Sequence, residues 1–505
     1  MPEPVDCETI GADGEVDGEV DDEVDDEVDD GGVAHADRWN HWHGFTQMAA
    51  YRSWVIERGE GNWLIDSQGG RYLDGVSSMW CNVHGHRKRE IDEAIIAQVG
   101  RVAHVTSLGM GCDTTARLAG RLAEIAPGDL DHTFFSSDGS SAIETALKLA
   151  IQYWGHAAER EGVAGLAAKT KYLAVGSAYH GDTTGAVSLG DIPRFHHLFK
   201  PILFETLRGP CPDTYRLPQG VGSVEEALGN YAGCYEALIR EHHHELAAVV
   251  IEPLIQAAAG MILHPPGFLA RLRRACDEHR VLLIADEVAT GFGRTGRMFA
   301  VEHEGVVPDL LCLGKGLTGG YLPMAATVAR RFLFEAFFAP RDQGAQFFHG
   351  HTFGGNPLAA AAALASIELF GKERILEQLP AKGERIDAGL VRLADHPRVG
   401  SIRRIGLMVG IELVADRRMK RPFPAGWEVG QQVCELALGK GVWVRPLGDV
   451  IVLMPPLSVT AEEIDLLVAA VCDAIETVTA TLARPSASGP RGAPAGGRVS
   501  SVSVF

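Results

Sequence analysis

The stretch Val281-Leu282-Leu283-Ile284-Ala285-Asp286-Glu287 decides the fold, because five apolar residues run directly into two acids. A glycine-rich segment then extends to Gly296. A short apolar run bounded by turn residues is typical of a buried strand in a parallel sheet. This prediction places Asp286 at the carboxyl end of a strand, which is the edge where open α/β sheets bind their ligands.

A second apolar run, at 310–313, is closed by Gly314-Lys315-Gly316. The sequence therefore predicts an acid and a lysine at the ends of two neighbouring strands. This pair suits pyridoxal phosphate as a cofactor. The lysine can form a Schiff base with the aldehyde, and the carboxylate can keep the ring nitrogen protonated, so that the ring accepts electrons.

Two other interpretations of this stretch stay open from these residues alone. Residues 291–296 match the G-x-G-x-x-G pattern of dinucleotide-binding proteins. That pattern opens a long apolar helix directly after its strand, whereas residues 287–290 intervene here and 297–309 are short and polar. An acid and a lysine at strand ends can also lack any chemical role. Lys315 does not fit a P-loop, because no serine or threonine follows it.

The composition limits the class of protein. The chain has 505 residues, 46% of them hydrophobic, which is ample for a large core in two domains or in one domain with long extensions. Residues 1–30 hold 15 acids and no lysine or arginine, so the net charge of −20 falls to −5 without them. A mildly acidic body argues against a nucleic-acid or anionic-membrane partner.

The cysteines and the apolar segments indicate a cytoplasmic setting. The nine cysteines are an odd number and form no C-x-x-C pair, which favours reduced thiols. The chain shows no basic-then-apolar start of a signal peptide. No apolar stretch reaches the roughly 18 residues that a membrane-spanning helix needs.

The domain organisation follows from the changes in composition. We expect an acidic disordered tail at 1–37 and a second disordered tail, rich in Pro, Gly and Ser, at 484–505. Between them we expect the N-terminal part of a small domain (38–85), a large cofactor-binding domain (86–345), and an interface loop with the C-terminal part of the small domain (346–483). Local patterns predict helices at 89–99, 115–125, 142–154, 225–244 and 268–279, strands at 133–135, 171–175 and 248–252, and a hairpin at 60–74 around Gly69-Gly70.

A third motif, Ser137-Asp138-Gly139-Ser140, connects the strand predicted at 133–135 to the helix predicted at 142–154. Free backbone N–H groups and hydroxyls at a helix N-terminus form a phosphate site. An ordinary helix cap uses the same residue types, so both interpretations stay open.

These motifs resemble, in this order, the class III aminotransferases of pyridoxal-phosphate fold type I, over residues 38–483. The resemblance is carried by Ser137-Asp138-Gly139-Ser140, Tyr179-His180-Gly181, Asp286-Glu287 with 290–296, Gly314-Lys315, and 352–358. It implies an α/β fold with a large domain around a mostly parallel central sheet and a smaller α+β domain. It also implies a homodimer with two active sites at the subunit interface.

Within the class, five segments are similar to the members that convert 8-amino-7-oxononanoate to 7,8-diaminononanoate in biotin biosynthesis: 74–80, 150–154, 179–183, 443–446 and 453–456. The implied reaction is a ping-pong transamination. Two alternatives remain. One is another class III transaminase, acting on ω-amino acids or polyamines with pyruvate or 2-oxoglutarate. The other is a non-catalytic cofactor-binding regulator.

The resemblance assigns roles residue by residue. Lys315 is the Schiff-base lysine and the general acid and base, and Asp286 pairs with the pyridine nitrogen. Gly139, Ser140, His351 and Thr352 bind the cofactor, with Thr352 supplied by the partner chain, and Tyr179 stacks on the ring. The substrate pocket is formed by Trp80, Tyr179, Lys315, Gly350 and Phe45, and Arg445 meets the substrate carboxylate. No metal is expected.

Three positions differ from the better-known members of this group. Phe45 stands where they have tyrosine, His351 where they have proline, and Met79 where they have a second tryptophan. The phenylalanine and histidine forms resemble relatives that use lysine as the amino donor. Loss of one hydroxyl removes a hydrogen-bonding group that can discriminate between donors. We expect S-adenosylmethionine as the donor, with lysine as the alternative.

Overall fold

The structure is a computed structural model that describes residues 32–482, in two compact units that comprise 32–55 and 56–482. The first unit contains helix α1 (Val33–Trp39) and the short helix η1 (Met48–Ala50). Asp37 holds this unit together, because its carboxylate accepts hydrogen bonds from the Tyr51 and Ser53 hydroxyls at 2.7 and 2.6 Å. Most of the predicted tail at 1–37, and the whole tail at 484–505, lie outside the described residues. Helix α1 begins inside the range predicted for the first tail.

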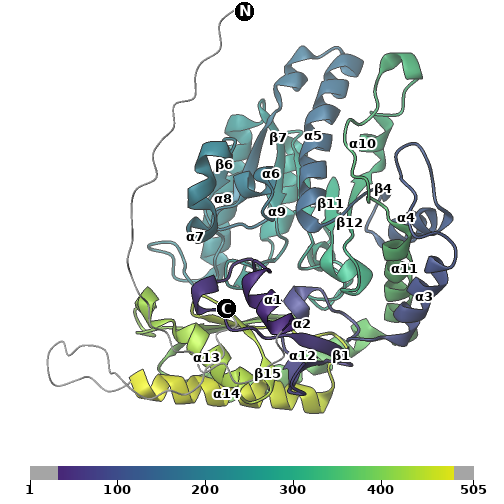
Figure 1. Ribbon diagram of the computed structural model, residues 1–505. Helices are drawn as coiled ribbons and strands as arrows, with labels where there is room; N and C mark the ends of the chain where they lie inside the picture. Colours follow the sequence, from purple (N-terminus) through teal and green to yellow (C-terminus); the bar gives the residue numbers. More distant parts are fainter. Residues whose placement is uncertain (1–31, 483–505) are drawn as a thin grey trace, which may run out of the picture. The chain divides into compact units, whose positions relative to one another are not determined.

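A seven-stranded sheet forms the centre of the second unit (Figure 1), in the order β4-β12-β11-β10-β7-β5-β6. All neighbouring strands are parallel except around β12, which is antiparallel to both β11 and β4. The bounds are β4 (Leu130–Ser136), β12 (Ala325–Arg330), β11 (Leu310–Leu313), β10 (Leu282–Asp286), β7 (Leu246–Ile251), β5 (Lys171–Val175) and β6 (Leu207–Gly209). The expected α/β fold with a mostly parallel sheet is confirmed, and the two apolar runs at 281–285 and 310–313 are adjacent strands.

Helices cover this sheet, and their bounds are α3 (Arg89–Val99), α4 (Asp113–Ile125), α5 (Gly139–Glu161), α6 (Thr184–Leu189), α7 (Pro193–His196), α8 (Val224–His242), α9 (Phe268–Glu278), α10 (Arg331–Glu335) and α11 (Pro357–Lys372). Helix α5 packs closely, because it buries the small side chains of Ala142, Ala146 and Ala150. Trp154 fixes the helix against β7 by donating a hydrogen bond from Nε1 to the Ala247 carbonyl at 2.9 Å.

Of the remaining strands, one set joins residues 56–74 to residues 442–443 of the second unit. One sheet has the order β1-β2-β3-β15 and the other β13-β14-β17-β16. Their bounds are β1 (Ile56–Glu60), β2 (Trp63–Asp66), β3 (Arg71–Asp74), β15 (Val442–Trp443), β13 (Val399–Ile405), β14 (Met408–Leu413), β17 (Val450–Leu453) and β16 (Arg445–Leu447); a small ribbon pairs β8 (Ile255–Gln256) with β9 (Ile262–Leu263). The predicted hairpin around Gly69-Gly70 is confirmed as the antiparallel pair of β2 and β3.

Three long helices, α12 (Ile375–Leu390), α13 (Val429–Leu438) and α14 (Ala461–Leu482), gather beside β15 (Figure 1). The predicted division into a large and a small domain falls inside the second unit and stays a prediction. Among residues 32–482, no helix combines the length and the apolar character that crossing a bilayer requires.

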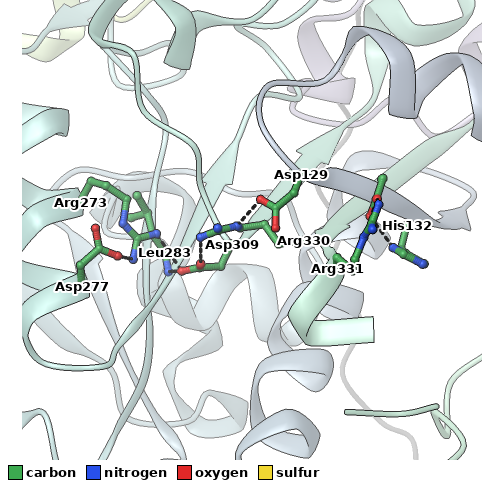
Figure 2. Close-up of polar contacts among 9 residues, drawn as sticks. Asp129, His132, Arg273, Asp277, Leu283, Asp309, Arg330 and Arg331 are labelled. Carbon is green, nitrogen blue, oxygen red and sulfur yellow. Dashed lines mark hydrogen bonds and ion pairs between the residues drawn. The ribbon is translucent and has the colours of Figure 1, made fainter. Parts of the chain in front are cut away.

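A charged network lies where β10 and β11 begin and β12 ends, in the central sheet (Figure 2). Asp309 precedes β11, and one oxygen of its buried carboxylate accepts hydrogen bonds from the Leu283 N–H at 2.7 Å and from Arg273 at 2.8 Å. Arg330, at the end of the antiparallel strand β12, bridges Asp309 and Asp129. These residues hold the amino-terminal ends of β10 and β11 and the carboxyl end of β12 together. Asp286 and Lys315 lie at the opposite ends of β10 and β11.

The loop after β10 forms turns and then the short helix η4 (Ala300–Glu304), not the long apolar helix of a dinucleotide-binding motif. Arg294 in this loop is fully buried. Its guanidinium donates hydrogen bonds to Ser77 Oγ at 3.1 Å and to the carbonyls of Pro455, Trp80 and Asn82 at 2.9, 3.2 and 2.8 Å. No carboxylate within residues 32–482 forms an ion pair with it, and burial lowers its pKa to about 10.

Replacing Arg294 with methionine should lower the free energy of unfolding by about 3 kcal/mol or more, because four oxygens lose a buried donor. Thermal melting measures the effect. The matched control is Arg297→Met, since exposed Arg297 donates, among residues 32–482, only to the Glu302 carbonyl at 3.3 Å. Surface changes of this kind shift stability by about 0.5 kcal/mol or less. Equal melting temperatures for the two variants would contradict a central role for Arg294.

Candidate active site

A cavity of about 260 Å³ lies at the carboxyl ends of five strands, β4, β5, β7, β10 and β11. Its lining residues are Trp80, Asp138, Gly139, Ser140, Tyr179, His180, Gly181, Glu252, Ala258, Asp286, Val288, Ala289 and Lys315. Six residues predicted from the sequence are among them: Trp80, Gly139, Ser140, Tyr179, Asp286 and Lys315. The topology thus brings together segments that are widely separated in the chain.

Lys315 enters the cavity directly after β11. It begins the short helix η5 (Lys315–Thr318) with a positive φ of 42°, and its Nζ lies 5.5 Å from the centre of the Trp80 ring. Burial lowers the pKa of its amine, an effect that the negative charges of Asp286 and Glu252 partly oppose. A lowered pKa increases the fraction of neutral amine, which is the form that acts as nucleophile and base.

Asp286 ends β10 with both carboxylate oxygens held in place. One oxygen lies 2.7 Å from His180 Nδ1, and the other accepts the Val288 N–H at 3.0 Å. The His180 ring is buried, and its Nε2 has no hydrogen-bond partner among the described residues. No sequence motif assigned a role to His180. Its position beside Tyr179 on a strand-end loop was the only local signal, because its contact with Asp286 spans 106 positions.

The N-terminus of α5 also lines the cavity. Asp138 caps the helix by accepting the Ser141 N–H at 2.9 Å, and Ser140 Oγ accepts the Asp182 N–H at 3.3 Å. Gly181 has a φ of +118°, and a Cβ on it would lie 1.9 Å from Ser140 Oγ. Only glycine fits here. The cap and the phosphate site are therefore compatible, because the first-turn N–H groups and the Ser140 hydroxyl can face an anion.

Glu252 and Tyr179 form one wall of the cavity. Glu252 follows β7 and accepts the Tyr179 N–H at 3.3 Å and the Ala257 N–H at 3.0 Å. Burial raises its pKa from 4.5 to about 7. The Tyr179 hydroxyl donates to Asp182 at 2.7 Å, and burial raises the pKa of Tyr179, so this ring stays neutral. Glu252 is the last residue of the strand predicted at 248–252, and no sequence motif gave it a function.

The segment that carries Trp80 has an unusual backbone. Residues of α2 (Ser77–Trp80) all have positive φ, between 45° and 73°, so the turn is left-handed. Each such residue costs roughly 1–2 kcal/mol when it is not glycine. Asp74 opposes this cost by accepting hydrogen bonds from the Ser78 N–H at 2.9 Å and the Ser78 hydroxyl at 2.8 Å. Nothing in the sequence signalled this turn.

Five predicted site residues do not line the cavity. Gly350 and Thr352 are exposed and His351 is half-buried, all in the loop before α11. Arg445 begins β16, with its Nη1 3.8 Å from Met79 Sδ. Phe45 belongs to the first unit, where its side chain is 61% exposed.

The polar groups of the cavity fit pyridoxal phosphate. The α5 N-terminus with Ser140 provides donors for the phosphate, and the glycine at 181 leaves space beside it. Asp286 provides an anchored carboxylate for the ring nitrogen, and Lys315 an amine for the aldehyde. These groups suit different parts of one flat, anionic molecule, and they line a single cavity.

Glu252 generates a pH-dependent prediction for the cofactor-free protein. The folded state holds the Glu252 proton more tightly than the unfolded state, so stability is lost as pH rises from about 4.5 through 7. The full loss corresponds to about 3 kcal/mol. In Glu252→Gln this loss disappears, so its melting temperature relative to the parent should rise between pH 5 and pH 8.

The control is Glu225→Gln, which changes an exposed acid on α8. Its melting temperature should follow the parent at every pH. If Glu252→Gln also ran parallel to the parent across this range, Glu252 would already be ionised in the folded protein at pH 5.

Comparison with known proteins identifies the family. The family model "Aminotransferase class-III" matches residues 46–475. The adenosylmethionine-8-amino-7-oxononanoate aminotransferase of Nitratidesulfovibrio vulgaris is 52% identical over 445 residues, which cover 87% of this chain and 80% of that protein.

Solved structures agree with this match. The crystal structure of adenosylmethionine-8-amino-7-oxononanoate aminotransferase from Methanocaldococcus jannaschii has a TM-score of 0.82 at 42% identity, and covers 88% of this chain and 98% of its own. A PLP-bound amine transaminase from an uncultivated Pseudomonas species has a TM-score of 0.81 at 34% identity, with coverage of 87% and 98%. The chain therefore belongs to the class III aminotransferases, enzymes that use pyridoxal phosphate as cofactor.

Proposed function

We propose that this enzyme transfers an amino group from S-adenosylmethionine to 8-amino-7-oxononanoate, giving 7,8-diaminononanoate for biotin biosynthesis. The observation that carries the chemistry is the meeting of Lys315, Asp286 and the α5 N-terminus around one cavity. The choice of substrate is supported by the relatives above, which are named for this acceptor and donor.

The residues of the chain divide the work of a transamination. When bound, pyridoxal phosphate supplies a ring that accepts electrons from the substrate carbon. Asp286, held by His180, would pair with the ring nitrogen and favour its protonated form. Lys315 Nζ would take the α-proton of the donor and deliver it to the cofactor carbon, and it would carry the reverse transfer in the second half-reaction. The keto product leaves before 8-amino-7-oxononanoate enters, which is a ping-pong order.

We assign Arg445 to the carboxylate of the acceptor. Its guanidinium is planar and suits a carboxylate through two hydrogen bonds. Burial lowers the pKa of Arg445, and a bound carboxylate would stabilise its charged form. This chain differs from the better-known members of the group at Phe45, Met79 and His351. Lysine is therefore the second donor to be tested.

We further propose a homodimer with shared active sites. Gly350, His351 and Thr352 lie in a loop next to exposed aromatic side chains. The exposed apolar residues of this region are Leu108, Met110, Phe338, Phe348 and Phe353. Apolar side chains of this size favour burial in an interface.

We also propose that the chain divides into a large domain at 86–345 and a small domain formed by 38–85 and 346–483. The proposed location of the enzyme is the cytoplasm.

The substrate is tested by supplying the purified holoenzyme with 8-amino-7-oxononanoate and either S-adenosylmethionine or lysine, and measuring diaminononanoate by mass spectrometry. Product should form with S-adenosylmethionine. Arg445→Ala should lower kcat/KM for the acceptor by roughly 30- to 1000-fold, because a charge-paired carboxylate contributes about 2–4 kcal/mol. The donor half-reaction should change much less.

Lys315→Ala is the matched inactive control and should give no product with either donor. Product with lysine alone would reassign the donor. Absence of product with both donors, together with rapid amination of pyruvate, would overturn the proposed substrate and favour another class III transaminase, acting on ω-amino acids or polyamines, while the enzyme class would stand.

The shared site is tested by subunit exchange. Lys315→Ala chains and Thr352→Ala/Gly350→Trp chains should each be nearly inactive as homodimers. If the loop serves the partner's site, mixing them forms hybrid dimers with one intact site and restores up to about half of the parent's activity per hybrid dimer. Exchange is verified with differently tagged chains. Hybrids that form but stay inactive would show that each chain completes its own site.

A further inference from the structure

We infer that Asp74 is a positioning residue, which holds the left-handed turn Ser77–Trp80 so that Trp80 faces Lys315 and Met79 faces Arg445. The turn thereby sets how well the acceptor fits. This inference rests on the roles proposed for Lys315 and Arg445.

The turn connects the two ends of the proposed acceptor pocket. Trp80 lies 5.5 Å from Lys315 Nζ, and the adjacent residue Met79 lies 3.8 Å from Arg445 Nη1. Left- and right-handed turns direct successive side chains differently. The handedness of these four residues therefore determines whether both contacts can form at once.

The turn is held by groups outside it. Asp74 is fully buried, and its carboxylate takes two hydrogen bonds from Ser78 and lies 3.1 Å from His86 Nε2. The Ser77 hydroxyl donates to the Met454 carbonyl at 2.6 Å. Arg294 binds Ser77 Oγ and the Trp80 carbonyl. Backbone conformations that L-residues avoid persist only when their surroundings impose them, and they concentrate at functional sites.

Ser78 offers a test of conformation at constant chemistry. Its φ is 45°, a value that glycine adopts freely, alanine less readily and valine very poorly. All three substitutions remove the same hydroxyl. Differences within the series Ser78→Gly, Ser78→Ala and Ser78→Val therefore report the preference for the left-handed backbone, and not the loss of the bond to Asp74.

Two measurements follow on full-length protein. In the holoenzyme, Ser78→Val and Asp74→Asn should raise the KM of the acceptor by about 10-fold, since small displacements of positioning groups have effects of this order. The rate of the donor half-reaction should change less than the KM. Ser78→Gly should stay close to the parent in both.

In cofactor-free protein, acylation of Lys315 by an amine reagent is followed by peptide mass spectrometry. The rate should increase in the order Gly, Ala, Val at position 78, and Trp80→Ala gives the upper reference. This readout does not depend on the substrate, so its outcome is separate from that of the proposed function. The KM can be read with whichever acceptor proves active.

Equal labelling rates and equal KM values across the Ser78 series would overturn the inference. The same conclusion would follow if all changes scaled with a lower melting temperature, because the turn would then serve only the fold. If Ser78→Val gives no folded protein, the comparison of Ser78→Gly, Ser78→Ala and Asp74→Asn decides between the two outcomes.

Discussion

The buried guanidinium of Arg294 is the interaction on which the arrangement of the site depends. It lies in the loop after the central strand β10 and binds oxygens from Ser77, Trp80, Asn82 and Pro455. A charge in the interior is costly unless its donors are satisfied. Here carbonyl dipoles take the place of a carboxylate, and the pKa of about 10 leaves the group charged at neutral pH. One side chain thus connects the central sheet to segments near both ends of the second unit.

Two kinds of group surround the cavity, and they meet different physical demands. Asp286 must keep a fixed direction, and His180 and the Val288 N–H hold both of its oxygens. In the proposed reaction, Lys315 exchanges protons. Its amine lies beside the Trp80 ring, and burial lowers the pKa of the amine. In the proposed reaction, these contacts suit Asp286 as an anchored electrostatic partner and Lys315 as the base.

The sequence predicted the parts of this structure that depend on local patterns. The apolar runs ending at Asp286 and before Lys315 are adjacent parallel strands, and the helix predicted at 89–99 has those bounds. Strand order and the pairing of His180 with Asp286 could not be predicted, because both depend on contacts between distant segments. The left-handed turn at 77–80 contains no glycine, so its local residue preferences point away from the observed backbone.

The parallel pairing of β15 with β3 has a consequence for how the chain folds. The Leu73 and Gly75 N–H groups donate to the carbonyls of Gly441 and Trp443, each at 2.9 Å. On the ribosome, the amino-terminal hairpin must wait for residues made more than 360 positions later before its edge is covered. Contacts of such long range slow folding and leave a strand edge available to other chains. During synthesis, the residues of the hairpin are therefore made long before β15, and for that time the edge of β3 is exposed to pairing with other chains.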